Sequence, residues 1–551
     1  MKKHSLGWMI GCAALTLHAC SPDALDESGT RDDEARLSRR LDRSTGATLV
    51  GASADHRYVA YGVACDAGDE RTELRLLDAR TASSRTLARG WMCAPGSVTF
   101  SPDGSLAVYG LMGSLRAVNT SNGRTVTVSR DGQSGVGVAF SPDSSWFAVA
   151  SLNGTSATID AWERDLRSHV EVSHAAYASP FGAGDAGLKV SPDSRSLLFL
   201  GGVTGPFPIG ALSLWSHSTR ASRVIEAGVS AMSYTLTSDW RRIAYVGGVA
   251  GPAEGQPPTP DAFAGDLTVR DLTTGRRQII ESHVTPGALE FARNGDVLVY
   301  TTGGGFTPGA LSTLKACAWG GAPVTLDSEV YAMFAPAKSV VVNPAGDRVA
   351  YAAALVPERF VAELRVATLP SSLASSRTAV VAPESVPGAM GYNRDGALVY
   401  LHTPTSGFPM AVGTLSVMSN GVTRELGTGV AQAGLRIDAS RREVMFVSEY
   451  DAGNAIGSLR FWDGLAQRAR TLGTRAAVMS LTPSPTWQRV AFVTLAEAPL
   501  GEVPLTTLRV ARLTGAPSTV RVEDGVTSQL VDDDGRALYT TADGLYTATS
   551  N

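Results

Sequence analysis

The feature of this 551-residue chain that most constrains its fold is a short motif that recurs along almost its whole length. The motif is an apolar stretch, a turn of the Ser-Pro-Asp-Gly type, and a second apolar stretch that ends in an aromatic residue. Its clearest copies are 100–109, 140–149 and 190–199. Weaker copies are anchored at Asp55, Asp239, Asn294, Ala345, Asp395, Ser440, Thr486 and Asp534. Self-similarity at a regular spacing of about 48 residues predicts a repeat architecture.

The composition of the turn has a physical reason. Proline presets the φ angle at the second position of a type I turn, aspartate accepts local backbone hydrogen bonds, and glycine adopts positive φ at the next position without strain. Each copy therefore predicts a β-hairpin. A second turn signal follows about twenty residues later, as in 119–123, 271–275 and 419–421. Two hairpins per repeat predict four strands, the content of one propeller blade.

The motif resembles the repeats of TolB-like and WD-repeat-like propellers of bacterial envelopes, in which Phe-Ser-Pro-Asp-Gly precedes an apolar run ending in Ala-Phe or Ala-Tyr. The resemblance covers residues 44–551, and the copies at Asp103, Asp143 and Asp193 keep Ser-Pro-Asp intact. It implies an all-β fold, a β-propeller of about eleven four-stranded blades. It implies no particular activity, because such propellers serve as scaffolds, enzymes and binding proteins alike.

The number of repeats raises the question of how they close. Propellers typically have about four to eight blades, so we expect two rings rather than one large ring. Residues 44–285 would form five blades and residues 286–551 six. The last repeat ends soon after 544–547, which we interpret as a third strand. A fourth strand from the N-terminal segment would join the chain ends, and that arrangement favours one large ring or nested rings.

The N-terminus has the features of a secretory signal. Lys2 and Lys3 precede an apolar run over 6–17, which is too short to span a membrane. The following Leu17-His18-Ala19-Cys20 resembles the lipobox of bacterial lipoproteins, although His18 departs from that pattern. The resemblance implies that residues 1–19 are a lipoprotein signal peptide and that Cys20 carries palmitate-type acyl chains. The alternative is an ordinary signal peptide with a chance cysteine near its cleavage site.

The lipobox resemblance also implies a location in the cell. Ser21 after the cysteine implies export to the outer membrane of a double-membraned cell, facing the periplasm or the cell surface. Residues 20–43 mix acids with arginines and show no sustained period, which predicts a flexible tether.

Loop length is the main asymmetry between repeats. In repeats two, three and eleven, few residues join the second strand to the third, whereas repeats four to ten have longer connections rich in Gly, Pro and Phe. Propeller topology places these connections on one face. Phe207, Phe306, Phe360 and Phe408 are candidates to contact a partner there, because aromatic residues on rigid loops lose little entropy on binding. The alternative is that the loops pack on one another as a lid over the ring.

The expected inner strands contain few residues that could act in catalysis or bind a metal. Runs such as 98–100, 138–140 and 340–342 are almost free of acids and histidine, so we predict no catalytic residue, no metal and no cofactor. The polar exceptions are Lys189, Glu290 and Arg436, which could surround a funnel mouth. The net charge of −4 argues against a nucleic-acid partner.

Cysteine usage bears on the compartment. Cys65 and Cys93 are both expected on the face of the long loops, so we predict a disulfide between them in the oxidising periplasm. Cys317 would be left unpaired and buried in an apolar strand.

Two functions follow from these features. The first is a non-catalytic, membrane-tethered scaffold that binds another envelope or cell-surface protein through its long-loop face. The alternative is a propeller enzyme or glycan-binding protein, of the lyase or glycosidase type, with a site at the ring mouth. Clustered His, Asp and Glu on inner strands would favour the second function, and their scarcity favours the first.

Overall fold

The computed structural model describes residues 36–549, apart from 44–45, 66–71, 92–96, 112, 130–136, 154–155, 177–186, 204–208, 232, 252–258, 286, 304–309, 332–338, 407–410, 498–503 and 515–517. Across these residues the chain is all-β, and its helical elements are short 3-10 turns. No helix in the described part is long and apolar enough to cross a membrane.

The strands follow the sequence repeats, four to a repeat. Repeats 1 to 4 contain β2 (Thr48–Ala52), β3 (Tyr58–Val63), β4 (Glu73–Asp78), β5 (Ser83–Arg89); β6 (Val98–Phe100), β7 (Leu106–Leu111), β8 (Ser114–Asn119), β9 (Thr125–Ser129); β10 (Val138–Phe140), β11 (Trp146–Asn153), β12 (Ser156–Glu163), β13 (His169–Ala176); and β14 (Lys189–Val190), β15 (Ser196–Gly201), β16 (Ile209–Ser216), β17 (Ala221–Ser230). Repeats 5 to 8 contain β18 (Tyr234–Leu236), β19 (Arg242–Gly247), β20 (Gly265–Asp271), β21 (Arg277–Val284); β22 (Leu289–Ala292), β23 (Val297–Thr302), β24 (Leu311–Ala318), β25 (Val324–Tyr331); β26 (Val340–Val342), β27 (Arg348–Val356), β28 (Val361–Thr368), β29 (Thr378–Tyr392); and the end of β29 with β30 (Leu398–Ser406), β31 (Val412–Ser419), β32 (Val422–Ala431).

Repeats 9 to 11 contain β33 (Arg436–Ile437), β34 (Val444–Asp451), β35 (Ile456–Asp463), β36 (Arg468–Ala477); β37 (Thr482–Pro483), β38 (Arg489–Leu495), β39 (Thr506–Arg512), β40 (Thr519–Asp524); and β41 (Val526–Val531), β42 (Arg536–Thr541), β43 (Gly544–Thr549) with β1 (Arg36–Asp42). The 3-10 turns are η1 (Pro260–Phe263), η2 (Arg293–Gly295), η3 (Leu373–Ser375), η4 (Gln432–Gly434) and η5 (Val478–Ser480). Every pairing is antiparallel and joins neighbouring strands of one repeat or of adjacent repeats.

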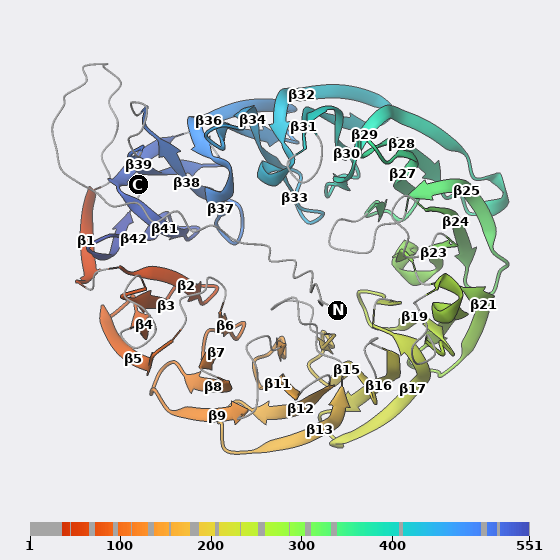
Figure 1. Ribbon diagram of the computed structural model, residues 1–551, viewed down its shortest axis with the longest axis horizontal. Coiled ribbons are helices and arrows are strands. Elements are labelled where there is room, and N and C mark those ends of the chain that lie inside the picture. The colour runs from red at the N-terminus through yellow and green to blue at the C-terminus, as the bar shows by residue number, and fades with distance from the viewer. Residues whose placement is uncertain are drawn as a thin grey trace, which may run out of the picture.

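The repeats follow one another in chain order round a ring (Figure 1). The first strand of a repeat, such as β6 or β33, lies toward the middle of the ring, and the fourth, such as β9 or β13, lies at its edge. Inner strands of consecutive repeats contact each other, as β18 does β22 and β22 does β26. This radial arrangement of antiparallel four-stranded sheets is that of a β-propeller.

The motif turn holds its hairpin by side-chain hydrogen bonds. In repeat 2 the buried Ser101 hydroxyl accepts the Leu106 N–H at 3.0 Å and donates to Asp103 at 2.8 Å. Gly104 follows with φ of 68°, as the sequence predicts for this position. In other copies the same position has positive φ without glycine: His56, Ser144, Ser194, Trp240 and Trp487.

The core is divided into apolar clusters, each of which combines residues from neighbouring repeats. The second strand contributes most, because it is apolar on both faces and packs between two adjacent sheets, as the fully buried β3 and β19 show. One cluster joins Val246 of repeat 5 to Tyr300 of repeat 6, and another joins Val59 of repeat 1 to Leu538 of repeat 11.

The expectation of two rings divided near residue 285 does not match this arrangement. Repeats 5 and 6, on either side of that residue, share an apolar cluster of the same kind as other neighbours. A ring boundary at residue 285 would expose these apolar sheet faces to solvent. The expectation relied on the usual blade number of propellers, whereas sheet-to-sheet packing decides where a ring closes.

The chain ends are joined by β1, which pairs with β43. Arg36 lies opposite Thr549, and Asp42 lies opposite Leu545. The N-terminal segment therefore supplies the fourth strand of repeat 11, which is the closure that the truncated last repeat predicts. Residues 36–42 were expected in the tether, and that part of the expectation is wrong. Their backbone groups pair with a strand some 500 residues away, so no local pattern marks them.

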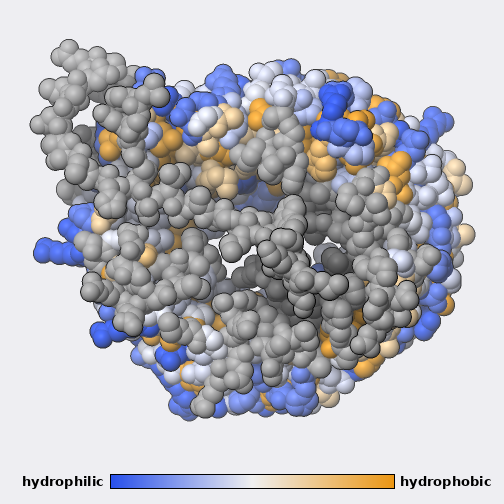
Figure 2. Space-filling view, in the orientation of Figure 1, coloured by the Kyte–Doolittle hydropathy of each residue, from blue (hydrophilic) through white to orange (hydrophobic). Residues whose placement is uncertain are grey.

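The outer edge carries the fourth strands, whose outward backbone groups could pair with another chain. In every repeat the pairing of the fourth strand with the third has a register shift, as in β8–β9 and β16–β17. Such bulges twist an edge away from flat pairing. Figure 2 shows hydrophilic residues along much of this edge, which also limits edge-to-edge association.

Candidate functional site

The direction of the strands gives the ring two different faces. The motif turns lie where each first strand passes to the second, and we call this side the motif face. The opposite side is the loop face, where each second strand passes to the third and each fourth strand passes to the next repeat. In the strand order, the longer connections mostly join second strands to third strands, as between β15 and β16, β19 and β20, and β38 and β39.

Of the four phenylalanines that could contact a partner, only Phe360 belongs to the described part of the chain. Phe207, Phe306 and Phe408 lie outside the described residues. Phe360 is half-buried, and its ring meets that of Tyr331 edge-on at 6.2 Å between centroids. It therefore packs at least partly on a neighbouring strand of repeat 6.

The connection around Phe360 is also shorter than the sequence suggested. β27 continues to Val356 and β28 begins at Val361, so four residues form the turn. Arg359 and Glu384 form an ion pair at 2.8 Å beside it. The expectation of seven long loops is wrong for repeat 7 and for repeat 9, where β34 and β35 are separated by 452–455. In repeat 7 the apolar end of β27 extends the hairpin, and in repeat 9 β34 continues through polar residues to Asp451, which pairs with Ile456.

Exposed large apolar side chains occur at strand ends on the loop face. Leu311 opens β24, Val356 closes β27, Met479 lies in η5, and Leu505 precedes β39. Their exposed fractions are 42%, 42%, 78% and 52%. They come from repeats 6, 7 and 10 and from the turn between repeats 9 and 10. The other large apolar residues exposed in the described part of the chain lie on fourth strands or in the turn after β35: Val224, Ile279, Val380, Val422 and Leu465. Exposed apolar groups that gather on one face are typical of an interaction surface.

The polar residues expected around the ring centre lie on three different inner strands. Lys189 is on β14, Glu290 on β22 and Arg436 on β33. The Lys189 ammonium lies 5.3 Å from the ring centroid of Tyr234. The Arg436 guanidinium donates to the carbonyl of Ala433 at 2.7 Å, and burial lowers its pKa. In the described part of the chain, no group of three His, Cys, Asp or Glu could hold a metal ion.

The cysteines are partly described. Cys65 is disulfide-bonded, and its partner lies outside the described residues, as does Cys93. The pairing of Cys65 with Cys93 therefore stays a prediction. Cys317 is free and buried on β24, and burial raises its thiol pKa to about 11. Residues 1–35, with the lipobox and Cys20, also lie outside the described residues.

The sequence interpretation missed a polar contact that links neighbouring repeats. Tyr351 on β27 donates to Asp327 on β25 at 2.8 Å, and Arg365 on β28 pairs with the same carboxylate at 2.8 Å. Burial raises the pKa of Asp327, but the hydrogen bonds from Arg365 and Tyr351 outweigh it and lower the pKa overall. The signal was present in the aromatic residue that ends each motif.

The same arrangement recurs elsewhere in the ring. In repeat 6, Tyr300 and Lys315 both bind Glu281 of repeat 5, at 2.6 and 2.5 Å. In repeat 1, Tyr61 and Arg75 both bind Asp42 of the closing strand β1. These side chains are structural, because each contact fixes one sheet against the next.

No protein-family model matches the chain, and no curated protein matches its sequence. Among solved structures, it is similar to TolB from Acinetobacter baumannii, with 17% identity over 48% of this chain and 62% of that chain and a TM-score of 0.23. It is also similar to Porphyromonas gingivalis dipeptidyl peptidase 4, with 12% identity over 76% of this chain and 65% of that chain and a TM-score of 0.38.

A third similar structure is oligogalacturonate lyase in complex with manganese, with 14% identity over 76% of this chain and 96% of that chain and a TM-score of 0.29. The chain spans less than two thirds of the length of the TolB and peptidase chains. At these identities the likeness concerns the fold alone. The assignment as a β-propeller rests on the strand pairing and the ring order of the chain itself.

Proposed function

We propose that this protein is a non-catalytic, membrane-tethered scaffold that binds another envelope or cell-surface protein through its loop face. The observation that carries the proposal is the set of exposed apolar side chains on that face: Leu311, Val356, Met479 and Leu505. Burying such side chains against a partner is favourable by about 25 cal/mol per Å². An apolar centre surrounded by polar groups is the usual composition of a protein-binding surface.

The scaffold in this proposal is a single ring of eleven blades, closed by β1. Support comes from the apolar clusters, which join repeat 5 to repeat 6 and repeat 11 to repeat 1. A ring of this size presents a broad face with contributions from many loops. That geometry suits a macromolecular partner, whose contact area is about 800 Å² per side in a standard complex.

The direction of β1 supports an orientation on the membrane. Its residue Arg36 lies opposite Thr549, where β43 reaches the motif face. β1 therefore begins at the motif face. If Cys20 carries the lipid, the motif face is the side nearer the membrane, and the loop face points away from it toward a partner. A disulfide at Cys65 also suits an exported protein.

The experiment that tests the function is a crosslinked pull-down from whole envelopes with the tagged full-length chain. The test variant is Met479→Ser with Leu505→Ser, which removes two exposed apolar groups from the loop face. We expect the wild type to recover one envelope protein in near-stoichiometric amount and the variant to recover at least about tenfold less.

The matched control is Leu465→Ser with Val422→Ser. These side chains are 78% and 71% exposed, comparable to Met479, but they lie at the motif-face ends of their repeats. The control is expected to recover the partner as the wild type does. Equal recovery by both variants, or recovery of no protein, would contradict the loop face as the binding surface.

The membrane tether is tested separately with Cys20→Ser. We expect the wild type to fractionate with membranes and to show a mass increase of its N-terminal peptide from acyl chains. The variant is expected in the soluble fraction, because the peptide chain has no other anchor in this proposal. A variant that stays with the membrane through washing at high salt would contradict the lipid anchor.

A further inference from the structure

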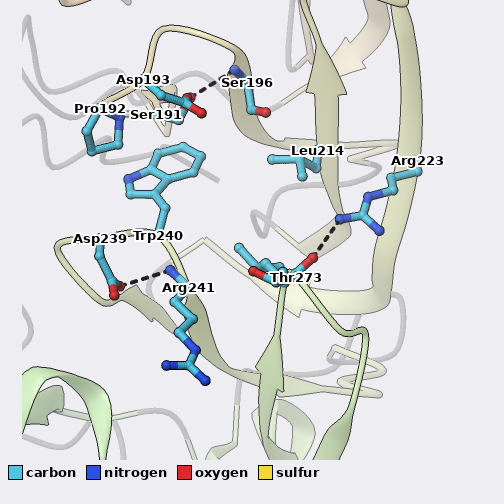
Figure 3. A pocket seen from close by; sticks show the side chains of 11 residues that line it. Ser191, Pro192, Asp193, Ser196, Leu214, Arg223, Asp239, Trp240, Arg241 and Thr273 are labelled. Carbon is cyan, nitrogen blue, oxygen red and sulfur yellow. Dashed lines mark hydrogen bonds between the residues drawn. The ribbon is translucent and has the colours of Figure 1, made fainter.

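The motif face carries a cavity between repeats 4 and 5, at the end of the blades opposite the loop face. Its volume is about 470 Å³, within the range of about 300–1,000 Å³ typical of small-molecule sites. The turn at Asp193 forms one side and the turn at Asp239 another, with Trp240 between them and Leu214 across from it (Figure 3). Most of its lining residues are polar or charged, and Pro192, Leu214, Trp240 and Leu272 supply its apolar surface.

Trp240 occupies the positive-φ position of the motif turn, as His56, Ser144, Ser194 and Trp487 do in other repeats. Its φ is 58°, in the left-handed region that costs a non-glycine residue about 1 kcal/mol or more. Glycine occupies the equivalent turn position at Gly104, Gly346 and Gly396. The half-buried indole packs partly against the cluster between repeats 4 and 5 and also lines the cavity. An indole displayed from a turn where glycine fits better offers a flat aromatic wall to a ligand.

The charged groups around the cavity are balanced and partly unused. Asp193 and Asp239 each accept turn hydrogen bonds through Oδ1, from Ser191 and Thr237 at 2.6 Å, and neither Oδ2 accepts a bond from the described part of the chain. These turn contacts lower the pKa of both carboxyls, so both are ionised at neutral pH.

Two guanidinium groups provide the matching donors. Arg241 uses Nε for Asp271 at 3.4 Å, and Arg223 uses one Nη for the carbonyl of Leu272 at 3.3 Å. Their remaining N–H groups have no partner in the described part of the chain. The cavity is therefore lined by two carboxylates, which are charge-assisted acceptors, and by two guanidinium groups, which are charge-assisted donors.

We propose that this cavity binds a neutral sugar. A pyranose has an apolar C–H face that can stack on the Trp240 indole and hydroxyls that both donate to carboxylates and accept from guanidinium groups. An anionic ligand such as a phosphate ester would face the Asp193 and Asp239 carboxylates. A cationic ligand would face Arg223 and Arg241. The balanced charge thus selects a ligand that is polar but uncharged.

The test is titration calorimetry of the full-length chain with glucose, galactose, mannose, N-acetylglucosamine, maltose and lactose, beside the charged sugars glucuronate and glucosamine. Dextran and a galactan distinguish a free sugar from a residue within a polysaccharide. We expect at least one neutral sugar to bind saturably, and more tightly than its charged counterpart. Trp240→Gly is expected to weaken binding about tenfold. Glycine suits the φ of 58° at this position, so the turn itself is kept.

The matched control is Trp487→Gly, which has the same turn position and a φ of 58° in repeat 10 but lies outside this cavity. It is expected to bind as the wild type does. A second test variant is Arg241→Ala, whose side chain is 61% exposed. Its partner Asp271 keeps the hydrogen bonds from the backbone N–H groups of Thr273 and Thr274. Sugar binding by this variant should be at least about threefold weaker. The proposal is overturned if no neutral sugar binds at up to about 100 mM, or if Trp487→Gly loses binding as Trp240→Gly does.

Discussion

The motif turn shows how few atoms specify each hairpin. In repeat 3 the buried Ser141 hydroxyl accepts the Trp146 N–H at 3.1 Å and donates to the Trp146 carbonyl at 2.8 Å. Asp143 accepts from the backbone N–H and the hydroxyl of Ser145, at 3.0 and 2.8 Å. Burial raises the pKa of Asp143, but hydrogen bonds from Ser145, Ser141 and Ser194 outweigh it and hold the pKa at about 2.

This pKa predicts a pH dependence of stability. The carboxyl is more acidic in the folded chain than in the unfolded chain, where its pKa is about 3.9. Its contribution is therefore complete above about pH 4 and is lost as the pH falls toward 2. Asp143→Asn should lower the unfolding temperature at pH 7 and flatten its decline between about pH 4 and 2. Thermal melts across this range check it, and parallel profiles of the two proteins would contradict it.

The cysteines give a second prediction at this scale. Cys317 is buried with a raised thiol pKa, so it should resist alkylation by iodoacetamide until the chain unfolds. Peptide mapping without reductant should find Cys65 joined to Cys93. Rapid labelling of Cys317 in the folded chain, or Cys65 joined to another cysteine, would contradict these assignments.

Residue-level sequence reasoning predicted the turn chemistry well, because serine, aspartate and glycine act within a few residues of one another. It did not predict that Trp240 would occupy a position with positive φ, since the local pattern favours glycine there. It also missed the contact of Tyr351 with Asp327, because the two residues come from different repeats. The motif marks the tyrosine of this contact but not the residue of the neighbouring sheet that it reaches.

At the scale of elements, β1 is the clearest departure from the sequence interpretation. Its residues are Arg36–Asp42, a segment rich in arginine that lacks the alternation of a buried strand. It is an outer-edge strand, so it need not be apolar on either face. Asp42 anchors it through Tyr61 and Arg75 of repeat 1, and Arg40 pairs with Asp543.

This anchoring predicts an effect specific to ring closure. Asp42→Ala leaves Arg75 without one carboxylate partner and should destabilise the chain by about 2–4 kcal/mol. It should also speed tryptic cleavage at Arg39 and Arg40, because β1 is released from β43. Denaturant unfolding and timed proteolysis measure the two effects.

The control for closure is Asp327→Ala, which removes a carboxylate from the similar contact with Tyr351 and Arg365. Its effect on unfolding should be similar in size, with no faster cleavage within 36–43. If both variants are cleaved there at the same rate, β1 is not held by Asp42 as described.

At the scale of the whole molecule, the all-β repeat architecture was readable from the sequence, and the way the repeats close was not. Each motif copy encodes its own hairpins, so the repeat pattern predicts four strands per repeat. Whether eleven repeats form one ring depends on which apolar sheet faces meet, as those of Val246 and Tyr300 do. Such packing between repeats cannot be read from spacing alone.

The ring arrangement makes a prediction about shape. Electron micrographs of the purified full-length chain should show one ring, closed by contact of repeat 11 with repeat 1 through Val59 and Leu538. Unfolding of a ring that shares its apolar clusters between neighbours should also be largely cooperative. Particles with two smaller rings would contradict the single ring.

The claim that the loop face binds a partner is tested most directly by photo-crosslinking in living cells. A photoreactive amino acid replaces Met479 on the loop face or Leu465 on the motif face, which are equally exposed at 78%. The account predicts one discrete adduct with an envelope protein from position 479 and none from position 465. An adduct from position 465 alone, or none from position 479, would contradict it.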